Sequence, residues 1–177
     1  MQASLGWVPP AGTLGRILEQ TRRRLPSLDG ARRAEQEGTG SPRQPLASAL
    51  RRPSIAIIAE LKRRSPSKGV LNEALDPRQS AQFERGGAAA ISVLTEPEFF
   101  GGSLDDLRLV HESVQLPLLK KDFHIDDAQL YEARTGGASA VLLIARALSP
   151  EQLPRMMRSA LDLGLENRES GRWRTGR

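Results

Sequence analysis

Two opposite charges end an apolar run early in the sequence. In the segment IAIIAELKRRSPSKGV, residues 55–70, apolar residues lead directly into Glu60 and Lys62. Residues two apart in a strand point to the same side, so both charges would share one face at the end of a strand. A carboxylate beside an ammonium group is one way to bring acid–base chemistry to such a position.

A second set of charges follows another apolar run. Lys120 and Lys121 end the run LPLLKKDF, residues 116–123, and would point to opposite sides of their strand. At a single strand end, charges that simply meet solvent are the simpler explanation. The repetition of this pattern favours a ligand site.

The segment SPSKG, residues 65–69, allows two interpretations. As a plain turn, it has the expected Ser, Pro and Gly. As a ligand loop, Ser65 and Ser67 together with backbone N–H groups could hold an oxyanion. The basic residues available to help are Lys62, Arg63, Arg64 and Lys68. The segment FFGGS, residues 99–103, similarly suggests either a hydrophobic plug or an aromatic wall.

Alternating strand and helix patterns would position these groups. Near-continuous apolar runs predict strands over residues 54–62, 88–96, 116–123 and 138–148. Amphipathic patterns predict helices over residues 76–87, 103–114, 126–137 and 149–164, the last with Ser149 as N-cap and Gly164 as its end. This repeat predicts an α/β fold in which helices cover a parallel sheet.

In such a fold, ligands bind at the carboxyl ends of the strands. Three of the predicted strands bring polar residues to that rim. These residues are Glu60, Lys62, Thr95, Glu96, Lys120, Lys121 and Asp122. We therefore expect a functional site there.

The region before residue 55 has a different character. Residues 13–28 have apolar residues near helical spacing, with Thr13 as an available N-cap and Pro26 as a stop. Residues 29–45 are polar and rich in Gly, Pro and charge, which is typical of a solvated linker. A second short helix over residues 46–52 would lead into the first strand.

Composition argues against several classes of function. The net charge is +5 at pH 7, but residues 1–54 carry +5, residues 55–166 carry −3 and residues 167–177 carry +3. The basic excess therefore lies in the flanks, and aromatic residues are only 4%, too few for a nucleic-acid stacking platform. We expect no nucleic-acid partner.

The chain has no cysteine and two histidines, so we expect neither disulfides nor a metal site. No segment approaches eighteen consecutive apolar residues, so we expect no membrane span, and the reducing cytoplasm is the expected location.

Taken together, these motifs resemble a known enzyme family. The pattern E-x-K-x-x-S-P-S, followed by F-x-G-S and then K-D-F, is similar to the first half of indole-3-glycerol phosphate synthase. The likeness covers roughly residues 55–166, and the helix at 13–28 resembles the extra N-terminal helix of that family.

The resemblance implies a TIM (β/α)8 barrel and a lyase of tryptophan biosynthesis. Such an enzyme closes the ring of 1-(2-carboxyphenylamino)-1-deoxyribulose 5-phosphate with loss of carbon dioxide and water, and no cofactor is implied. By position, Lys121 would be the general acid. Lys62 would bind the substrate carboxylate and share in proton transfer, and Glu60 would orient both lysines and the substrate hydroxyls.

The resemblance also implies binding residues. Ser65 would contact the phosphate, and the anthranilate side would be lined by Phe100, Phe123 and Leu142. We expect Glu60 to be a buried carboxylate, in which case the loss of one partner would cost about 3–5 kcal/mol.

The chain also departs from the family pattern. A complete barrel needs eight strands, and the sequence predicts four, followed by the basic segment NRESGRWRTGR. We expect an N-terminal helix and linker (1–54), half a barrel (55–166) and an unrelated tail (167–177). A frameshift, a truncated gene or a wrongly predicted splice would explain this tail, and a disordered terminus is the alternative.

The expected half-barrel would lack the catalytic groups of the second half. We therefore expect little or no synthase activity from the chain alone, with self-association or complementation through open sheet edges as one escape. The alternative function is an inactive half-barrel that acts at most as a phosphate-ligand binding or interaction module.

Overall fold

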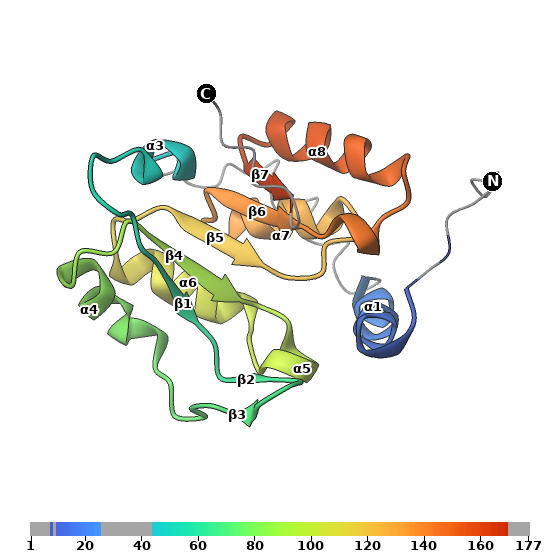
Figure 1. Ribbon diagram of the computed structural model, residues 1–177, viewed down its shortest axis with the longest axis horizontal. Helices are drawn as coiled ribbons and strands as arrows, with labels where there is room; N and C mark the ends of the chain where they lie inside the picture. Colours follow the sequence, from blue (N-terminus) through green and yellow to red (C-terminus); the bar gives the residue numbers. More distant parts are fainter. Residues whose placement is uncertain (1–7, 9, 26–43, 170–177) are drawn as a thin grey trace.

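The computed structural model describes residues 8, 10–25 and 44–169. A parallel five-stranded sheet forms its centre, with strand order β1-β4-β5-β6-β7 (Figure 1). The strands are β1 (Ile58–Leu61), β4 (Ala90–Leu94), β5 (Leu118–Lys121), β6 (Ala140–Leu143) and β7 (Glu166–Glu169). The predicted α/β class with a parallel sheet is confirmed.

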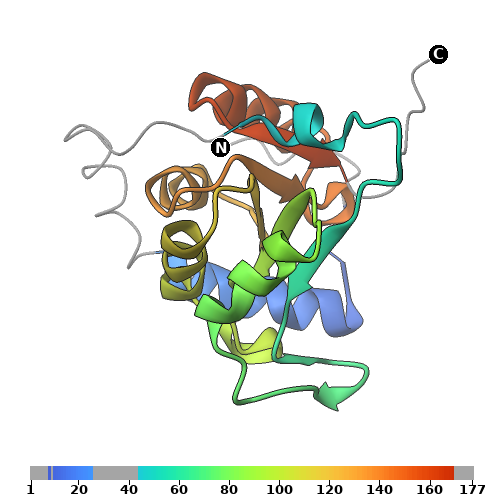
Figure 2. The same ribbon diagram turned by 90° about the vertical axis from the view of Figure 1, so that its left-hand side faces the viewer.

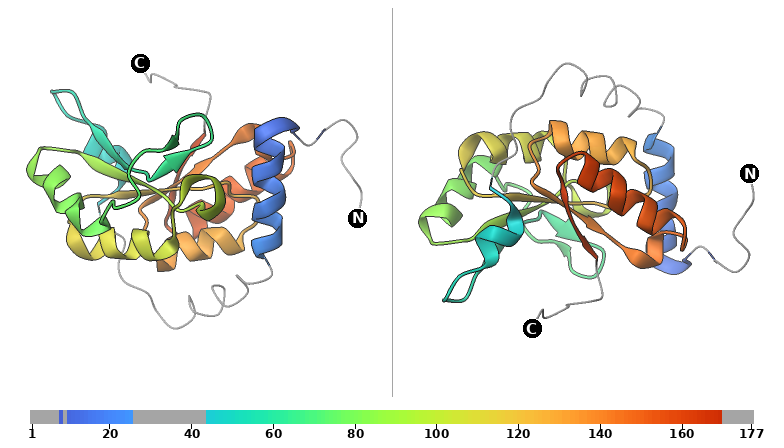
Figure 3. Two further views of the ribbon diagram at one scale, coloured as in Figure 1. Left: turned by 90° about the horizontal axis from the view of Figure 1, so that it is seen from below. Right: turned by 90° about the horizontal axis from the view of Figure 1, so that it is seen from above.

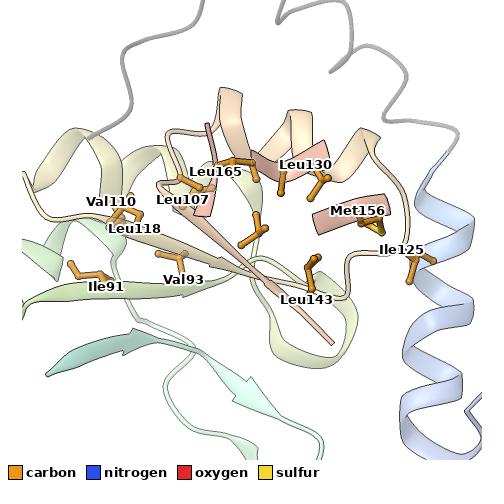
Figure 4. Packing of buried hydrophobic residues seen from close by; sticks show 14 of the residues in the cluster. Ile91, Val93, Leu107, Val110, Leu118, Ile125, Leu130, Leu143, Met156 and Leu165 are labelled. Carbon is orange, nitrogen blue, oxygen red and sulfur yellow. The ribbon is translucent and has the colours of Figure 1, made fainter. Parts of the chain in front are cut away.

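Helices cover one face of this sheet because alternate strand residues point to it. Ile91 and Val93 of β4, with Leu118 of β5, lie in the main core beside Leu107 and Val110 of helix α6 (Figure 4). The covering elements are η3 (Pro77–Gln79), α4 (Ser80–Arg85), α6 (Leu104–Ser113), α7 (Ala128–Thr135) and α8 (Gln152–Asp162). A short hairpin, β2 (Arg64–Ser65) with β3 (Gly69–Val70), extends away from these layers (Figure 2).

The opposite face carries a smaller core. Ala90, Leu119 and Ala140, which begin their strands or lie close to the beginning, pack against Leu46 of helix α3 (Leu46–Leu50). The Glu166 carboxylate accepts a hydrogen bond from the backbone N–H of Ala47 at 2.8 Å. Helix α3 therefore closes this face at the end opposite the predicted site.

Helix α1 (Gly12–Arg24) lies on the other side of the molecule from α4 in both views of Figure 3. Its buried Leu18 belongs to the main core. Ile125, in the loop after β5, belongs to the same core and lies beside helix α1 (Figure 4). The helix begins at Gly12 after Ala11, so the prediction that Thr13 is the N-cap is wrong. Pro26 lies outside the described residues, as does nearly all of the expected linker.

One of the two predicted ends of α8 is confirmed. The helix begins at Gln152 after Glu151, so the prediction that Ser149 is the N-cap is wrong. Ser149 still contacts the first residue of the helix, since its hydroxyl accepts a hydrogen bond from the Gln152 N–H and its N–H donates to the Gln152 side chain. Gly164, with φ of +70°, ends the helix in a conformation that favours glycine, as predicted.

All four predicted strands are shorter in the structure, and the one expected over residues 138–148 is limited to Ala140–Leu143 and followed by a 3-10 helix, η4 (Ala145–Ala147). The strand expected over residues 54–62 is limited to Ile58–Leu61, because its register begins with Ile58 opposite Ala90, the first residue of β4. The sequence predicts four strands, yet β7 adds a fifth that pairs with β6 from Glu166 onward. Its sequence, ENRE, has no apolar residue to signal a strand. Residues 170–177 lie outside the described part.

Among the described residues, no helix combines the length and apolar character needed to cross a membrane.

Candidate active site

The structure brings Glu60, Lys62 and Lys121 together. Glu60 binds both lysines, with one carboxylate oxygen 2.5 Å from the Lys62 ammonium and the other 2.5 Å from the Lys121 ammonium. Glu60 and Lys62 come from the end of β1, and Lys121 ends β5, with β4 between the two strands. A single carboxylate therefore fixes the spacing of two cations at the carboxyl rim of the sheet.

The Glu60 side chain is partly exposed, although a buried carboxylate was expected at this position. Its side chain is 29% exposed and that of Lys121 is 36% exposed, so the expectation of a buried carboxylate is wrong for the described chain. Partial burial acts to raise the pKa of Glu60, but hydrogen bonds and charges from Lys121 and Lys62 outweigh it and lower the pKa. Glu60 is thus held as an anion.

A cavity of about 540 Å³ opens beside Lys62, the member of the triad that lines it. The other lining residues come from the hairpin and its flank and from helix α1, together with two aromatic side chains. These lining residues are Thr13, Leu14, Ile17, Ser65, Pro66, Ser67, Lys68, Leu71, Phe100 and Phe123. The rings of Phe100 and Phe123 lie 6.0 Å apart with an interplanar angle of 35°. Of the two interpretations of FFGGS, the aromatic wall fits Phe100.

Ser65 and Ser67 lie in the hairpin that borders the cavity. The Ser65 hydroxyl accepts a hydrogen bond from the Lys68 N–H at 3.3 Å, which keeps the turn compact. Ser65, Lys62 and Lys68 together give the cavity a polar, cationic side. An oxyanion is the ligand chemistry that suits this side.

Two of the nearby arginines have structural partners instead. Arg63 forms a two-pronged ion pair with Asp106 at 2.5 and 2.9 Å and also donates to the Gly101 carbonyl. Arg64 donates to the carbonyl of Pro97 at 2.9 Å. Neither arginine lines the cavity. Of the four basic residues expected to help hold an anion, only Lys62 and Lys68 are therefore in a position to do so.

Thr95 and Glu96, the predicted rim residues of β4, also serve the framework. The buried Glu96 carboxylate accepts hydrogen bonds from the N–H groups of Glu98, Phe99 and Phe100, and so caps helix α5 (Pro97–Phe100). Burial raises the pKa of Glu96, and the charge of Asp122 adds to this effect. The cap fixes the turn that presents Phe100 to the cavity.

Lys120 lies in a second charge cluster on the helix-covered side. Its ammonium group is fully buried, 3.2 Å from Asp122 and 3.1 Å from Glu132. His124 is also buried, with Nε2 3.5 Å from Lys120 Nζ and Nδ1 3.0 Å from the Leu142 carbonyl. A carbonyl only accepts, so Nδ1 carries the proton and Nε2 faces the ammonium group.

The charges of this cluster shift two pKa values. Burial, together with the positive charge of Lys120, lowers the pKa of His124 to about 3. Burial acts to raise the pKa of Asp122, but the charges of Lys120 and Arg24 and the hydrogen bond from the Phe123 N–H lower it far below its usual range. Asp122 is therefore an anion and His124 a neutral ring.

Three predicted site residues, Glu60, Lys121 and Leu142, do not line the cavity. Glu60 and Lys121 are linked to it through Lys62, whereas Leu142 packs against the small core formed by Leu46, Ala90, Leu119 and Ala140. The β5–β6 register pairs Lys120 with Val141, so Leu142 lies on the same sheet face as Lys121. It shares the face of the triad without bordering the cavity.

Sequence reasoning missed the contribution of helix α1 to the cavity. Thr13, Leu14 and Ile17 line it, although their spacing in the sequence shows only that a helix has an apolar side. Within the described ranges, no group of three or more His, Asp or Glu side chains is arranged to hold a metal ion.

Comparisons with known proteins agree with this architecture. The family model for indole-3-glycerol phosphate synthase matches residues 14–167. The chain is 55% identical over 113 residues to an indole-3-glycerol phosphate synthase of Rhodopirellula baltica, covering 63% of this chain and 44% of that protein. It is 41% identical over 157 residues to indole-3-glycerol phosphate synthase 2 of Streptomyces coelicolor, covering 88% of this chain and 61% of that protein.

A third relative, an indole-3-glycerol phosphate synthase of Kineococcus radiotolerans, is 44% identical over 159 residues, covering 86% of this chain and 52% of that protein. The chain spans about half the length of the curated relatives that it matches. Its parallel βα units are part of the TIM-barrel fold of these proteins. The chain belongs to the indole-3-glycerol phosphate synthase family.

Proposed function

We propose that this protein acts in tryptophan biosynthesis as an indole-3-glycerol phosphate synthase. In this reaction the aromatic carbon that bears the carboxylate of 1-(2-carboxyphenylamino)-1-deoxyribulose 5-phosphate bonds to the C2 carbonyl carbon. The carboxylate leaves as carbon dioxide, and a subsequent dehydration gives indole-3-glycerol phosphate. The observation that carries this proposal is the Glu60 carboxylate bridging Lys62 and Lys121 beside the cavity.

Lys121 is the proposed general acid. Ring closure turns the C2 carbonyl oxygen into a hydroxyl, so a positioned ammonium group can donate the proton. The hydrogen bond to Glu60 keeps the Lys121 ammonium group in place at the rim. Glu60 thereby orients the acid without reacting itself.

Lys62 is the proposed partner of the substrate carboxylate. Lys62 lines the cavity, and its ammonium group contacts Glu60. Its positive charge therefore lies between the cavity and the Glu60 carboxylate. An ammonium group stabilises a carboxylate in the bound substrate and can share in the proton transfer that follows.

The remaining contacts are assigned by the character of the cavity walls. Ser65 on the polar side would contact the substrate phosphate, and the rings of Phe100 and Phe123 would pack against the anthranilate ring. Leu142, which does not border the cavity, would meet the substrate only if the ligand extends across the sheet face.

A second candidate function is binding of a phosphorylated ligand without turnover. It is favoured by one observation, namely that Lys62, Lys68 and the rings of Phe100 and Phe123 line the cavity, whereas Glu60 and Lys121 do not. The lining of the cavity thus has the chemistry to bind such a ligand, while the proposed acid lies outside the lining.

One experiment separates the two candidates. The purified chain is incubated with the substrate, and formation of the fluorescent indole product is followed, with Lys121→Ala as the matched variant. In parallel, calorimetric titration uses a substrate analogue in which the carbonyl is reduced to an alcohol. Turnover that Lys121→Ala abolishes supports the synthase, binding without turnover supports the second candidate, and absence of both contradicts the two proposals.

Self-association is a further part of the proposal. Among the described residues, β1 and β7 form the two edges of the sheet, and Ile55 and Ile57 near β1 are 90% and 60% exposed. Open edges beside apolar side chains favour pairing with another chain. Sedimentation velocity should show concentration-dependent dimers that Ile57→Lys weakens, and a monomer with a cooperative unfolding transition would contradict this.

The cytoplasm remains the expected location.

A further inference from the structure

We propose that Asp122 is a positioning residue that holds helix α1 against the cavity through Arg24. This inference rests on the proposed function for its effect on the reaction, but the attachment itself can be tested without turnover. Asp122 does not itself line the cavity. Its influence would act through the groups that it binds.

The first step concerns what α1 contributes. Thr13, Leu14 and Ile17, from the first half of the helix, form one side of the cavity. The cavity therefore keeps its shape only while α1 stays in place. Leu18 anchors the middle of the helix in the main core, and Arg24 is its last residue.

The second step concerns how the end of α1 is held. Arg24 forms an ion pair with Asp122 at 3.3 Å across 98 positions of sequence, and the Asp122 side chain is 1% exposed. The preceding arginines behave differently, since Arg22 and Arg23 pair with Glu19 on the same helix. Of these three arginines, Arg24 is the one that ties α1 to the strand end.

The third step concerns the other contacts of Asp122. One carboxylate oxygen accepts from the Phe123 N–H at 2.8 Å as well as from Arg24. The other accepts from the Thr95 hydroxyl at 2.9 Å and from Lys120 at 3.2 Å. A single carboxylate thus joins α1 to the ends of β4 and β5.

These contacts connect two walls of the cavity. The backbone of Phe123 is fixed by Asp122, and Phe123 lines the cavity together with residues supplied by α1. Lys121, the residue before Asp122, belongs to the triad with Glu60. Asp122 therefore sets the separation between α1 and the strand end that carries the proposed acid.

The expected consequence is a loss of affinity rather than a loss of chemistry. Releasing α1 removes one side of the cavity in the ground state and the transition state alike, which raises KM and leaves kcat nearly unchanged. The loss of one hydrogen bond between charged groups corresponds to an increase in KM of about tenfold.

The experiment compares Arg24→Gln with Arg23→Gln in the full chain. Both variants remove one positive charge from the same turn of α1, but only Arg24 binds Asp122. Amide hydrogen exchange over residues 12–25, analogue affinity and, where turnover is present, kcat and KM are measured for both. Arg24→Lys should restore part of the protection, and Asp122→Asn should reproduce the effect of Arg24→Gln if it folds.

We expect faster exchange in α1 and about tenfold weaker analogue binding for Arg24→Gln, with Arg23→Gln like the unmodified chain. Equal exchange in the two variants would overturn the inference, as would faster exchange with unchanged affinity. If the unmodified chain neither binds nor turns over, the proposed function fails, whereas the exchange comparison still decides whether Arg24 holds α1.

Discussion

Lys120 and Lys121 are neighbours in the chain and yet lie in two different electrostatic environments. Lys121 is 36% exposed and shares Glu60 with Lys62 at the carboxyl rim of the sheet. Lys120 is fully buried on the opposite side of the strand, between Asp122 and Glu132. Successive side chains of a β-strand point to opposite faces of the sheet, and this alone places the two lysines in different environments.

One sequence motif can therefore supply charges to two kinds of cluster, one accessible to a ligand and one fully buried. A charge available to a ligand must keep part of its surface free and cannot be fully surrounded by fixed partners. A fully buried ammonium group needs partners on all sides, because desolvation without them costs several kcal/mol. Lys121 meets the first condition and Lys120 the second.

The largest expected effect is on turnover when Lys121 is changed. Because a positioned acid contributes about 10²–10⁴ in rate, Lys121→Ala should reduce kcat by that factor and change analogue affinity far less. The product assay and calorimetric titration measure the two quantities. Arg108→Gln, at an exposed position on α6, is the control, and near-normal turnover of Lys121→Ala would reject the acid assignment.

The converse effect is expected at Lys120. Lys120→Met would leave Glu132 without its buried partner and weaken the pairing of Asp122, so the free energy of unfolding should fall by about 3–5 kcal/mol. Urea denaturation measures this change. Lys121→Met is the matched variant and should lose no more than about 1 kcal/mol, since its pair is partly exposed. Similar losses for the two variants would remove the distinction between the clusters.

The buried cluster should also make stability depend on pH through His124. Its pKa is lowered to about 3 in the folded chain, so the unfolded chain takes up this proton first as the pH falls. The stability is therefore full above the ordinary pKa of histidine and declines by about 1.4 kcal/mol per pH unit below about pH 6.

His124→Gln removes this titration and should flatten the decline. Urea denaturation at pH 7, 6 and 5 would measure the slope for both chains. An unchanged slope in the variant would mean that His124 is not held neutral in the folded state.

The smallest expected effect on stability is at Glu60. Both of its ion pairs are partly exposed, so Glu60→Gln should change the free energy of unfolding by less than about 1 kcal/mol. Turnover should nevertheless fall, because both lysines lose the carboxylate that orients them. Thermal denaturation and the product assay distinguish the two effects, and a large loss of stability would assign Glu60 to the framework.

The sequence predicted the features that depend on local pattern. Apolar runs located four strands, and Gly164 marked the end of α8 correctly, whereas the helix begins three residues after Ser149, the predicted N-cap. The period of two in a strand also predicted that Lys120 and Lys121 would point to opposite sides. These features are encoded in neighbouring residues.

Features that depend on distant partners were not predicted. The partner of Arg63 is Asp106, 43 positions away, and that of Arg24 is Asp122, 98 positions away, so neither pair leaves a local signal. The fifth strand, β7, is held by pairing with β6 and not by apolar residues. The accessibility of Glu60 likewise depends on what surrounds it in space.

The triad of Glu60, Lys62 and Lys121 is proposed to belong to a ligand site, whereas the cluster around Lys120 is not. Backbone amide resonances followed by NMR during titration with the reduced substrate analogue would test it. We predict shifts at Glu60–Lys68, Phe100 and Lys121–Phe123, with little change in α7, which carries Glu132. Saturating analogue that leaves the first group unchanged, or that shifts α7 most strongly, would contradict the account.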